Sequence, residues 1–390
     1  MITVAQALVS IFDIVTPLEN ESVPLARAAD RILAAPATAT RDQPPFASSA
    51  MDGYAVLETD ATPGITLNVI GESAAGHRFE GTVEAGQAVR IFTGAPVPEG
   101  ANRVIIQEDV TRAHDQITLN NNLDPSTYIR PLGTDFKTGS TLSAPRCLTP
   151  NDLALLASMN IPNVTVTRKP VVALMATGDE LVMPGDTPGP DQIIASNTFG
   201  LMALVETAGA EARILPIARD NAASLETAFA LAADADLIVT IGGASVGDHD
   251  LVGDVAQNLG LDRAFYKIAM RPGKPLMAGR IGNSILLGLP GNPVSSMVCG
   301  HIFMLPAIRA MQGLPAQPAP RMIATLAKAL PKNGPREHYM RARVEGGKIT
   351  AFERQDSALL SVLSTANALL VRPVDDGPKQ VGEKMEYVAI

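Results

Sequence analysis

The sequence predicts a multidomain protein of the α/β plus β class. We expect a central doubly wound α/β domain, an inserted small β domain, a discontinuous helical amino-terminal domain and a carboxy-terminal β barrel or sandwich. Three observations predict this architecture. The 390 residues exceed what one hydrophobic core usually supports. Strand and helix patterns alternate regularly only after residue 170. Short strands separated by Gly, Pro and Asp occur both before and after that region.

The composition limits the class of protein. Hydrophobic residues make up 46% of the chain and charged residues 18%, which is typical of globular proteins. A net charge of -9 argues against nucleic-acid binding, because phosphate backbones require clustered Lys and Arg. Cys147 and Cys299 lie far apart and form no CxxC pair, so neither a thiolate zinc site nor a disulfide scaffold is expected. The start lacks a signal-peptide pattern and prolines interrupt the apolar stretch 285–311, so we expect a cytoplasmic protein that spans no membrane.

Helix signals occur on both sides of the first β region. Thr3 and Gln6 have capping-box spacing and precede apolar residues at helical spacing. A second helix is predicted over residues 22–35. Thr149 and Pro150 mark the start of a third helix, with a capping hydroxyl followed by a favourable first residue. If these helices pack together, the β region is an insertion within a helical domain.

The predicted domain boundaries follow these changes of pattern. The helical amino-terminal domain comprises residues 1–42 and 138–169, and the inserted β domain comprises residues 43–137. The α/β domain covers residues 170–314. A proline-rich linker then leads into the carboxy-terminal β domain of residues 315–390.

Four apolar strands alternate with helices in the α/β domain, namely 171–176, 213–217, 237–241 and 284–289. Strands without polar alternation indicate a parallel sheet that is covered on both faces. Ligands bind such sheets at the carboxyl ends of the strands. The loops after these four strands are therefore the candidate site.

The loop after the first strand carries Asp179 and Glu180. Carboxylate oxygens at this edge are suited to Mg²⁺, because hard cations prefer oxygen ligands. A solvated acidic turn is an equally good interpretation of these two residues alone.

The third strand runs into the segment GGASVGDHD at residues 242–250. Its glycines allow a tight turn and a close approach to a ligand, and the following helix start attracts an anion. The segment has neither the P-loop nor the GxGxxG pattern. It therefore predicts another kind of phosphate site, with Asp250 as a metal or ligand contact, and a ligand-free tight turn is the alternative. The candidate binding residues are Gly242, Gly243, Ser245 and Gly247.

Lys267, Arg271 and Lys274 place three cations within eight residues of an acidic chain. Their loop lies between two predicted strands at the carboxyl edge of the sheet. Their heads are therefore expected to converge on an oxyanion. A solvated basic loop is the alternative.

A turn rich in Pro and Gly ends the fourth strand and opens a long helix. Hydroxyl and backbone N–H groups in such a first turn can take an anion, although the same pattern also fits a bare helix cap. The candidate binding residues are Pro290, Gly291, Asn292, Pro293 and Ser295.

Six segments in order along the chain resemble the MoeA family of molybdopterin molybdenumtransferases, which includes the E domain of gephyrin. They are MDGYA at 51–55, FTGAPVPEGA at 92–101, TGDEL at 177–181, GGASVGDHD at 242–250, RPGKP at 271–275 and LPGNPVS at 289–295. Each segment is weak alone, but the ordered set is highly specific. Together with the proline-rich linker and the carboxy-terminal β segment, the resemblance covers essentially the whole chain.

The resemblance implies a homodimer whose active site is shared between subunits, and a reaction of adenylylated molybdopterin with molybdate and Mg²⁺ that releases AMP. It implies catalytic roles for Asp52, Thr93, Asp135, Glu180, Asp250, Lys267 and Arg271. It implies Mg²⁺ binding by Glu180, Asp220 and Asp250. Lys274, Arg341 and Ser357 join the glycine and proline loops as substrate-binding residues. Transient contacts with a molybdopterin adenylyltransferase and with molybdoenzyme maturation factors are also implied.

The chain departs from the family pattern at three positions. Arg271 stands where many relatives carry Lys, so a planar fork replaces a point charge. His249 and Leu251 flank Asp250 where relatives often have a small residue and an aromatic. Two other functions are compatible with parts of the sequence. A molybdopterin adenylyltransferase shares the α/β domain but is usually a short single-domain protein, and a non-catalytic scaffold that binds a partner would not need the charged site residues.

Overall fold

The computed structural model describes residues 1–243 and 251–390. The chain divides into two compact units. Unit 1 comprises residues 1–21, 30–34 and 166–390. Unit 2 comprises residues 22–29 and 35–165, and is therefore discontinuous in sequence. The finer domain boundaries proposed from the sequence remain predictions.

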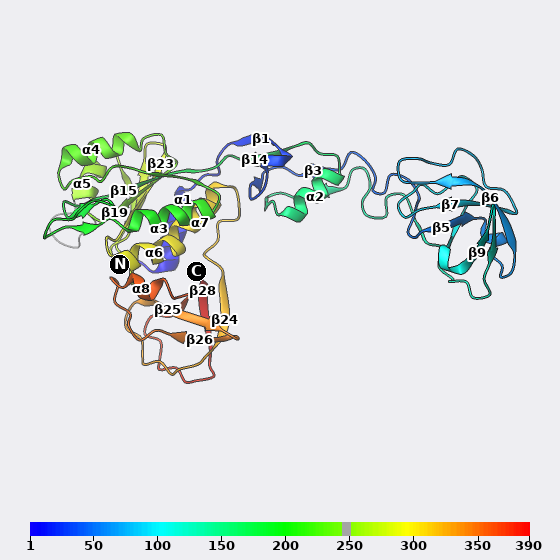
Figure 1. Cartoon of the computed structure of the whole chain (residues 1–390). Coiled ribbons are helices and arrows are strands. Elements are labelled where there is room, and N and C mark those ends of the chain that lie inside the picture. Colours follow the sequence, from blue (N-terminus) through cyan, green and yellow to red (C-terminus); the bar gives the residue numbers. More distant parts are fainter. Residues whose placement is uncertain (244–250) are drawn as a thin grey trace. The chain divides into compact units, whose positions relative to one another are not determined.

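The centre of unit 1 is a six-stranded sheet with the order β18-β15-β19-β23-β22-β20. Figure 1 labels three of its strands, β15, β19 and β23. The strands are β15 (Val171–Ala176), β18 (Glu211–Ile214), β19 (Leu237–Ile241), β20 (Asp262–Tyr266), β22 (Met277–Ile281) and β23 (Ser284–Leu289). The first four strands in the sheet order pair in parallel, and β22 and β20 extend the sheet antiparallel. The predicted parallel α/β sheet is confirmed, with an antiparallel edge.

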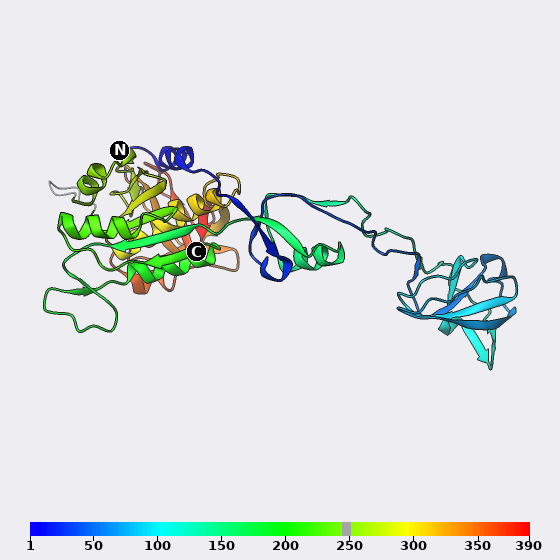
Figure 2. The same ribbon diagram turned by 90° about the horizontal axis from the view of Figure 1, so that it is seen from above.

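Helices cover both faces of this sheet, as expected for a doubly wound domain. On one face, buried side chains of α1 (Val4–Ile14), α3 (Asn197–Thr207), α6 (Pro293–Cys299) and α7 (Leu305–Met311) share a core with the strands. On the other face lie α4 (Ala222–Leu231) and α5 (Leu251–Asn258). Figure 2 shows α1 in blue on unit 1. Its predicted capping box is present, since Thr3 and Gln6 exchange hydrogen bonds of 2.9 and 3.1 Å.

The long helix predicted after residue 293 is interrupted. A π segment, η4 (Gly300–Met304), separates α6 from α7. One helix among the described residues, Pro293–Met311, has the length and apolar composition needed to cross a membrane. However, 78% of its apolar window is buried inside the protein, which is the position of a core helix.

Unit 2 contains the small β domain that the sequence predicts. Its six-stranded sheet has the order β8-β5-β7-β6-β10-β9. The strands are β5 (Gly53–Val56), β6 (Thr66–Ser73), β7 (Gln87–Ile91), β8 (Arg103–Ile106), β9 (Val110–Ala113) and β10 (Gln116–Leu119). Short pairs also form between β3 (Ala37–Thr38) and β12 (Thr141–Leu142), and between β4 (Ser48–Ser49) and β11 (Ile129–Arg130).

The third predicted helix is α2 (Pro150–Ser158), with Thr149 at its cap. Thr149 and Asp152 form a complete capping box, because each backbone N–H donates to the other side chain. The helix contacts the short 3-10 turn η1 (Leu25–Arg27) within unit 2.

The helix predicted over residues 22–35 is wrong. The chain instead forms β1 (Asn20–Pro24), η1 and β2 (Ile32–Leu33). Pro24 lacks the backbone N–H that a helix interior needs, and Asp30 has a left-handed φ of 60° that ends any helix. The buried Leu33 pairs with Val166 of β14 (Asn163–Thr167). Strand pairing therefore overrides the local helix propensity of this segment.

The carboxy-terminal region of unit 1 is a barrel, which resolves the choice between barrel and sandwich. Its strands are β24 (Arg321–Leu326), β25 (Glu337–Glu345), β26 (Lys348–Ala351), β27 (Ala368–Arg372) and β28 (Lys384–Ala389). They pair in the order β25-β26-β24-β28-β27, and a further pairing of β27 with β25 closes the ring. The two-residue strand β21 (Met270–Arg271) of the α/β region adds to β25 from outside.

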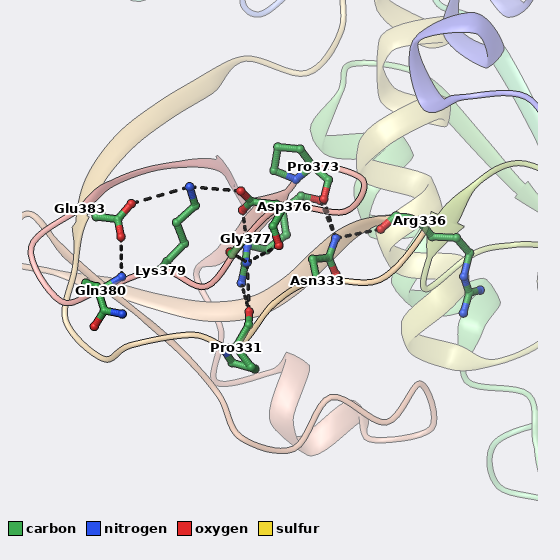
Figure 3. A network of polar contacts seen from close by, with 10 residues as sticks. Pro331, Asn333, Arg336, Pro373, Asp376, Gly377, Lys379, Gln380 and Glu383 are labelled. Carbon is green, nitrogen blue, oxygen red and sulfur yellow. Dashed lines mark hydrogen bonds and ion pairs between the residues drawn. The ribbon is translucent and has the colours of Figure 1, made fainter.

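Arg372 at the end of β27 is fully surrounded by acceptors. Its guanidinium is 2% exposed and donates to the Asp376 carboxylate at 2.6 Å and to the carbonyls of Pro331 and Gly377. Figure 3 shows this network and its neighbour Lys379, whose ammonium lies 3.1 Å from Asp376. The network joins the loops at one end of the barrel, so we assign it a structural role.

Candidate functional site

A pocket of about 910 Å³ opens at the carboxyl edge of the α/β sheet. The loops after β15, β18, β19 and β23 all contribute to its wall, as the strand-end rule predicts. The sequence-predicted residues that line it are Glu180, Asp220, Gly242, Gly243, Pro290, Gly291, Asn292 and Pro293. Asp250, Ser245 and Gly247 were also predicted, and they lie outside the described residues.

Close backbone packing explains the glycines on one side of the pocket. Gly242 and Gly243 have left-handed φ values of 95° and 68°. A Cβ on Gly243 would lie 2.2 Å from Cγ2 of Val252 and 2.9 Å from the Thr177 hydroxyl. A Cβ on Gly291 would lie 3.4 Å from Cα of Gly242. The turns that follow β19 and β23 therefore touch each other, and their backbones form the pocket wall.

Carboxylates line another side of the pocket. Glu180 and Asp220 are both exposed and both line the pocket. The Arg219 guanidinium fixes the turn between β15 and Glu180, because it donates to the carbonyls of Asp179 and Leu181 at 3.1 and 3.3 Å. Sequence reasoning missed a further acidic lining residue, Asp254, in the first turn of α5. Its position one turn beyond the glycine segment was the available signal.

These carboxylates would bind Mg²⁺ only together with oxygen atoms from a bound phosphate and from water. No group of three or more His, Cys, Asp or Glu side chains that could hold a metal ion occurs within residues 1–243 and 251–390. Mg²⁺ commonly binds through one or two carboxylates, and phosphate oxygens and water complete its shell. Glu180 and Asp220 match that pattern in donor type and number.

The amino-terminal end of α3 also lines the pocket, which the sequence did not predict. Ser196, Asn197 and Thr198 all face it. The Asn197 amide donates to the Gly291 carbonyl at 2.7 Å and so fixes the proline-rich turn. An Asn at the start of a helix after a strand-end loop is a common capping signal, and here its side chain supports a neighbouring loop instead.

The predicted cations lie on the loop between β20 and β22. Tyr266 pairs with Met277, and Met277 pairs with Gly288, so this loop is at the carboxyl edge of the sheet as expected. A hydrogen bond of 3.1 Å from the Ile268 N–H to the Lys274 carbonyl closes the loop. The Lys267 ammonium lies 4.8 Å from the centre of the Tyr266 ring. Of this loop, only Pro275 lines the pocket itself.

Arg271 and Arg341 approach each other where the barrel meets this loop. Arg271 is the β21 partner of His338 on β25. Arg341 is 1% exposed, and its guanidinium donates to the Gln355 side chain and to the Asp356 carbonyl. Burial and the positive charge of Arg271 lower the pKa of Arg341, against the opposing effect of Asp356.

His338 carries no charge at neutral pH. Burial, followed by the positive charge of Arg271, lowers the pKa of His338 to about 4. Arginines therefore provide the positive potential of this region.

The predicted serines lie beside this region. The Ser357 carbonyl accepts the Val294 N–H at 3.0 Å, which joins the barrel loop to the start of α6. Ser295 follows Val294 and is 4% exposed. The structure thus brings Arg341, Ser357 and Ser295 to one boundary between the barrel and the α/β domain.

The remaining predicted residues belong to unit 2. The Asp52 carboxylate accepts both the backbone N–H and the hydroxyl of Thr93 at 2.7 Å. The Thr93 N–H, followed by its hydroxyl, lowers the pKa of Asp52. Asp135 is exposed and is held through its backbone N–H, which donates to the Gln43 carbonyl at 2.9 Å. The structure therefore joins two of these three residues directly.

Family models match nearly the whole chain. The MoeA N-terminal region (domain I and II) matches residues 2–160. A probable molybdopterin binding domain matches residues 173–310, and the MoeA C-terminal region (domain IV) matches residues 324–390.

Known proteins resemble this chain in both sequence and fold. The chain is 36% identical over 376 residues to a molybdopterin molybdenumtransferase of Haemophilus influenzae, covering 94% of this chain and 93% of that one. It is also 36% identical over 388 residues to one from Nostoc, covering 94% and 88%. A crystal structure of a molybdopterin biosynthesis MoeA protein from Pyrococcus horikoshii covers 100% of both chains with a TM-score of 0.86 and 27% identity. The chain therefore belongs to the MoeA family.

Proposed function

We propose that the chain is a molybdopterin molybdenumtransferase, which transfers molybdenum from molybdate into adenylylated molybdopterin and releases AMP. One observation carries the proposal. A single pocket at the sheet edge combines a glycine-lined backbone wall with exposed carboxylates, and a loop with three cations lies at the same edge. This combination suits a substrate that contains phosphate together with a small oxyanion. The similarity to molybdopterin molybdenumtransferases supports it.

Each side of the site has a separate role in this proposal. Backbone N–H groups beside Gly242 and Gly243 orient the phosphates of the adenylylated pterin. Lys267, Arg271 and Lys274 attract molybdate, which is a dianion, and the buried Arg341 adds positive potential beside Arg271. Cleavage of the phosphoanhydride between the pterin phosphate and AMP makes the overall transfer favourable.

Glu180 and Asp220, with Asp250, would hold Mg²⁺. The ion would supply positive charge next to the phosphate oxygens. The chain's own carboxylates would fix its position, and the Arg219 contacts keep the Glu180 turn in place.

The active form in this proposal is a cytoplasmic homodimer. Asp52, Thr93 and Asp135 of one subunit would complete the site of the other subunit. The enzyme would receive its substrate by transient contact with a molybdopterin adenylyltransferase and pass its product to molybdoenzyme maturation factors. Mixing an Asp52→Ala subunit with a Lys274→Ala subunit tests the shared site. Activity is expected to return in the mixture, and a mixed dimer as inactive as either parent would contradict the arrangement.

Single-turnover release of AMP tests the reaction. Wild-type protein, adenylylated molybdopterin, molybdate and Mg²⁺ are expected to give AMP and molybdenum cofactor. Lys274→Ala and Asp220→Asn are expected to slow this release by about 100-fold or more, since each removes a charge that stabilises the transition state. Lys348→Ala, at an exposed position on β26, is the matched control and is expected to retain the wild-type rate.

Two results would contradict the proposal. Wild-type rates in both site variants would remove these residues from the mechanism. Consumption of ATP with molybdopterin in the absence of molybdate would instead indicate a molybdopterin adenylyltransferase.

A further inference from the structure

The side chain of Arg90 lies beside the backbone that follows Asp52 in unit 2. Arg90 is on β7 and pairs with Tyr54 on β5, directly across the sheet. Its guanidinium donates to the Gly53 carbonyl at 3.1 Å and to the Gln107 side chain at 2.9 Å. One arginine therefore joins the residue next to Asp52 to two other parts of the β domain.

The backbone around Asp52 is fixed from two sides. Gln107 follows β8, and its N–H donates to the Asp52 carbonyl at 3.0 Å. A Cβ on Gly53 would lie 2.0 Å from the Ile105 carbonyl oxygen, so only glycine allows β5 and β8 to lie this close. Two consecutive carbonyls thus accept hydrogen bonds from Gln107 and Arg90, which also bond to each other.

The same guanidinium also contacts the residue that precedes Thr93. The guanidinium carbon of Arg90 lies 4.7 Å from the centre of the Phe92 ring and 5.1 Å from the centre of the Tyr54 ring. A cation over the face of an aromatic ring is attracted by its electrons. Phe92 leads to Thr93, whose N–H and hydroxyl both donate to the Asp52 carboxylate. Arg90 therefore contacts a chain neighbour of each member of this pair.

The charge of Arg90 acts on Asp52 as well. The Thr93 N–H, followed by its hydroxyl, lowers the pKa of Asp52, desolvation opposes them, and the positive charge of Arg90 adds to them. A guanidinium stays protonated throughout the pH range in which enzymes work. Hydrogen bonds and charge therefore both favour an ionised and oriented carboxylate.

We propose that Arg90 is a positioning residue of the molybdenum transfer, which orients the Asp52 carboxylate and its Thr93 partner. The inference rests on the proposed function, in which both residues take part in the reaction. Within the described chain, the Arg90 hydrogen bonds go to the Gly53 backbone and to Gln107, so Arg90 acts through the position of Asp52. A planar guanidinium can donate to two acceptors while its face covers aromatic rings, and lysine lacks this combination.

Single-turnover release of AMP measures the effect of Arg90. Arg90→Leu keeps an apolar side chain near the aromatic rings and removes both hydrogen bonds and the charge. The rate at saturating adenylylated molybdopterin is expected to fall about tenfold, because a small misplacement of a reacting group is costly. The substrate concentration that gives half of the maximal rate is expected to change by less than about twofold. Arg112→Leu is the matched control, since Arg112 is exposed on β9 of the same sheet and is expected to retain the wild-type rate.

The Asp52→Ala background separates positioning from a general effect on folding. That background has no carboxylate to orient, so adding Arg90→Leu is expected to lower the rate by less than about twofold further. A purely structural role predicts the same loss, about tenfold, in both backgrounds.

Gln107→Leu is a second variant, because its side chain is exposed and its backbone N–H is kept. It removes one of the two Arg90 acceptors, and the rate is expected to fall about threefold, again only when Asp52 is present. Thermal unfolding of each variant shows whether it is folded. Should Arg90→Leu be unfolded, Gln107→Leu decides the question in its place.

Three results would overturn the inference and leave the proposed function intact. The first is a wild-type rate in Arg90→Leu, or in Gln107→Leu where that variant decides. The second is an equal loss with and without the Asp52 carboxylate, because Arg90 would then support the whole domain. The third is a wild-type rate in Asp52→Ala. Wild-type protein that releases no AMP with molybdate and Mg²⁺ would refute the proposed function, and the inference with it.

Discussion

The end of the barrel and the edge of the α/β sheet differ in how completely their buried polar groups are hydrogen-bonded. At the barrel, the Arg372 guanidinium is 2% exposed and donates to acceptors on all sides. At the sheet edge, the Thr177 and Thr198 hydroxyls are equally buried, yet neither has a partner within the described chain. A buried polar group with all its partners indicates a structural network, whereas an unpaired buried hydroxyl lowers stability locally.

The carboxylates of the two regions also differ, because one is paired inside the barrel and the others are exposed in the pocket. Asp376 is committed to Arg372 and Lys379, so its charge is neutralised within the barrel. Glu180 and Asp220 are exposed in the pocket wall. Substitutions should therefore lower stability at the barrel network and lower binding at the pocket.

The largest effect on stability is expected at the barrel. Asp376→Asn should lower the free energy of unfolding by about 3 kcal/mol, because Arg372 would keep its buried charge without a carboxylate partner. Chemical denaturation measures the change. Asp375→Asn is the matched control, because Asp375 is exposed and Asn tolerates its φ of 52°. Similar losses in both variants would show that Asp376 has no special structural role.

The same pair should give an acid-dependent difference. Burial raises the pKa of Asp376, but the hydrogen bonds from Arg372 and Lys379 outweigh it, so the pKa is lowered overall. A lowered pKa in the folded state adds stability above the unfolded value of about 3.9, and this gain is lost as pH falls through the folded value. The stability gap between wild type and Asp376→Asn should therefore shrink below pH of about 4. A gap that stays constant down to pH 2 would contradict the ionic origin.

An intermediate effect is expected at the glycine wall. Gly243→Ala should cost about 2–3 kcal/mol, since it combines a left-handed φ with a Cβ placed 2.2 Å from Val252. Gly282→Ala is the control, because its φ of 56° is similar but nothing lies within 4 Å of the added Cβ. The difference between the two variants measures the steric part. Equal stability would mean that the wall can move to admit a side chain.

A smaller effect is expected at the capping box of α2. Thr149→Ala should cost about 1 kcal/mol, because the Asp152 N–H loses its acceptor. Thr3→Ala makes the same change at the cap of α1, where the hydroxyl accepts the Gln6 N–H. Denaturation curves of the two variants should shift by comparable amounts. No shift in either would show that neither box contributes to stability.

The smallest effect on stability is expected at the pocket hydroxyls. Thr177→Val and Thr198→Val should change the free energy of unfolding by less than about 0.5 kcal/mol or increase it, because each removes a hydroxyl that has no partner in the part of the chain the structure describes. Denaturation without ligand provides the measurement. A decrease of more than about 1 kcal/mol in the free energy of unfolding of either variant would show that these hydroxyls stabilise the fold, as the barrel network does.

Much of the fold could be predicted because its signals are local. The capping boxes at Thr3 and Thr149 place two helix starts correctly, and continuous apolar runs place the four parallel strands. The segment 22–35 could not be predicted in this way. Its strands gain hydrogen bonds from partners more than a hundred residues away, such as Val166 for Leu33, and local propensity does not include them.

The site was partly predictable for the same reason. Strand-end loops with glycine, proline and acidic residues stand out in sequence, and these loops line the pocket. Thr177, Thr198 and Asp254 did not stand out, because threonine and a lone aspartate are common at helix starts and turns. Only the three-dimensional arrangement reveals that the two threonine hydroxyls lack hydrogen-bond partners within residues 1–243 and 251–390. The roles of Asp52, Thr93 and Asp135 remain predictions.

The short strand β21 has a consequence for how the oxyanion loop is positioned. Glu337 donates its N–H to the Ala269 carbonyl at 3.0 Å, and Arg271 pairs with His338. Arg271 is thus anchored to the barrel although it belongs to the sequence of the α/β domain. Any movement of the barrel relative to the α/β domain would therefore move the Arg271 side chain as well. The position of this positive charge at the oxyanion loop depends on the barrel.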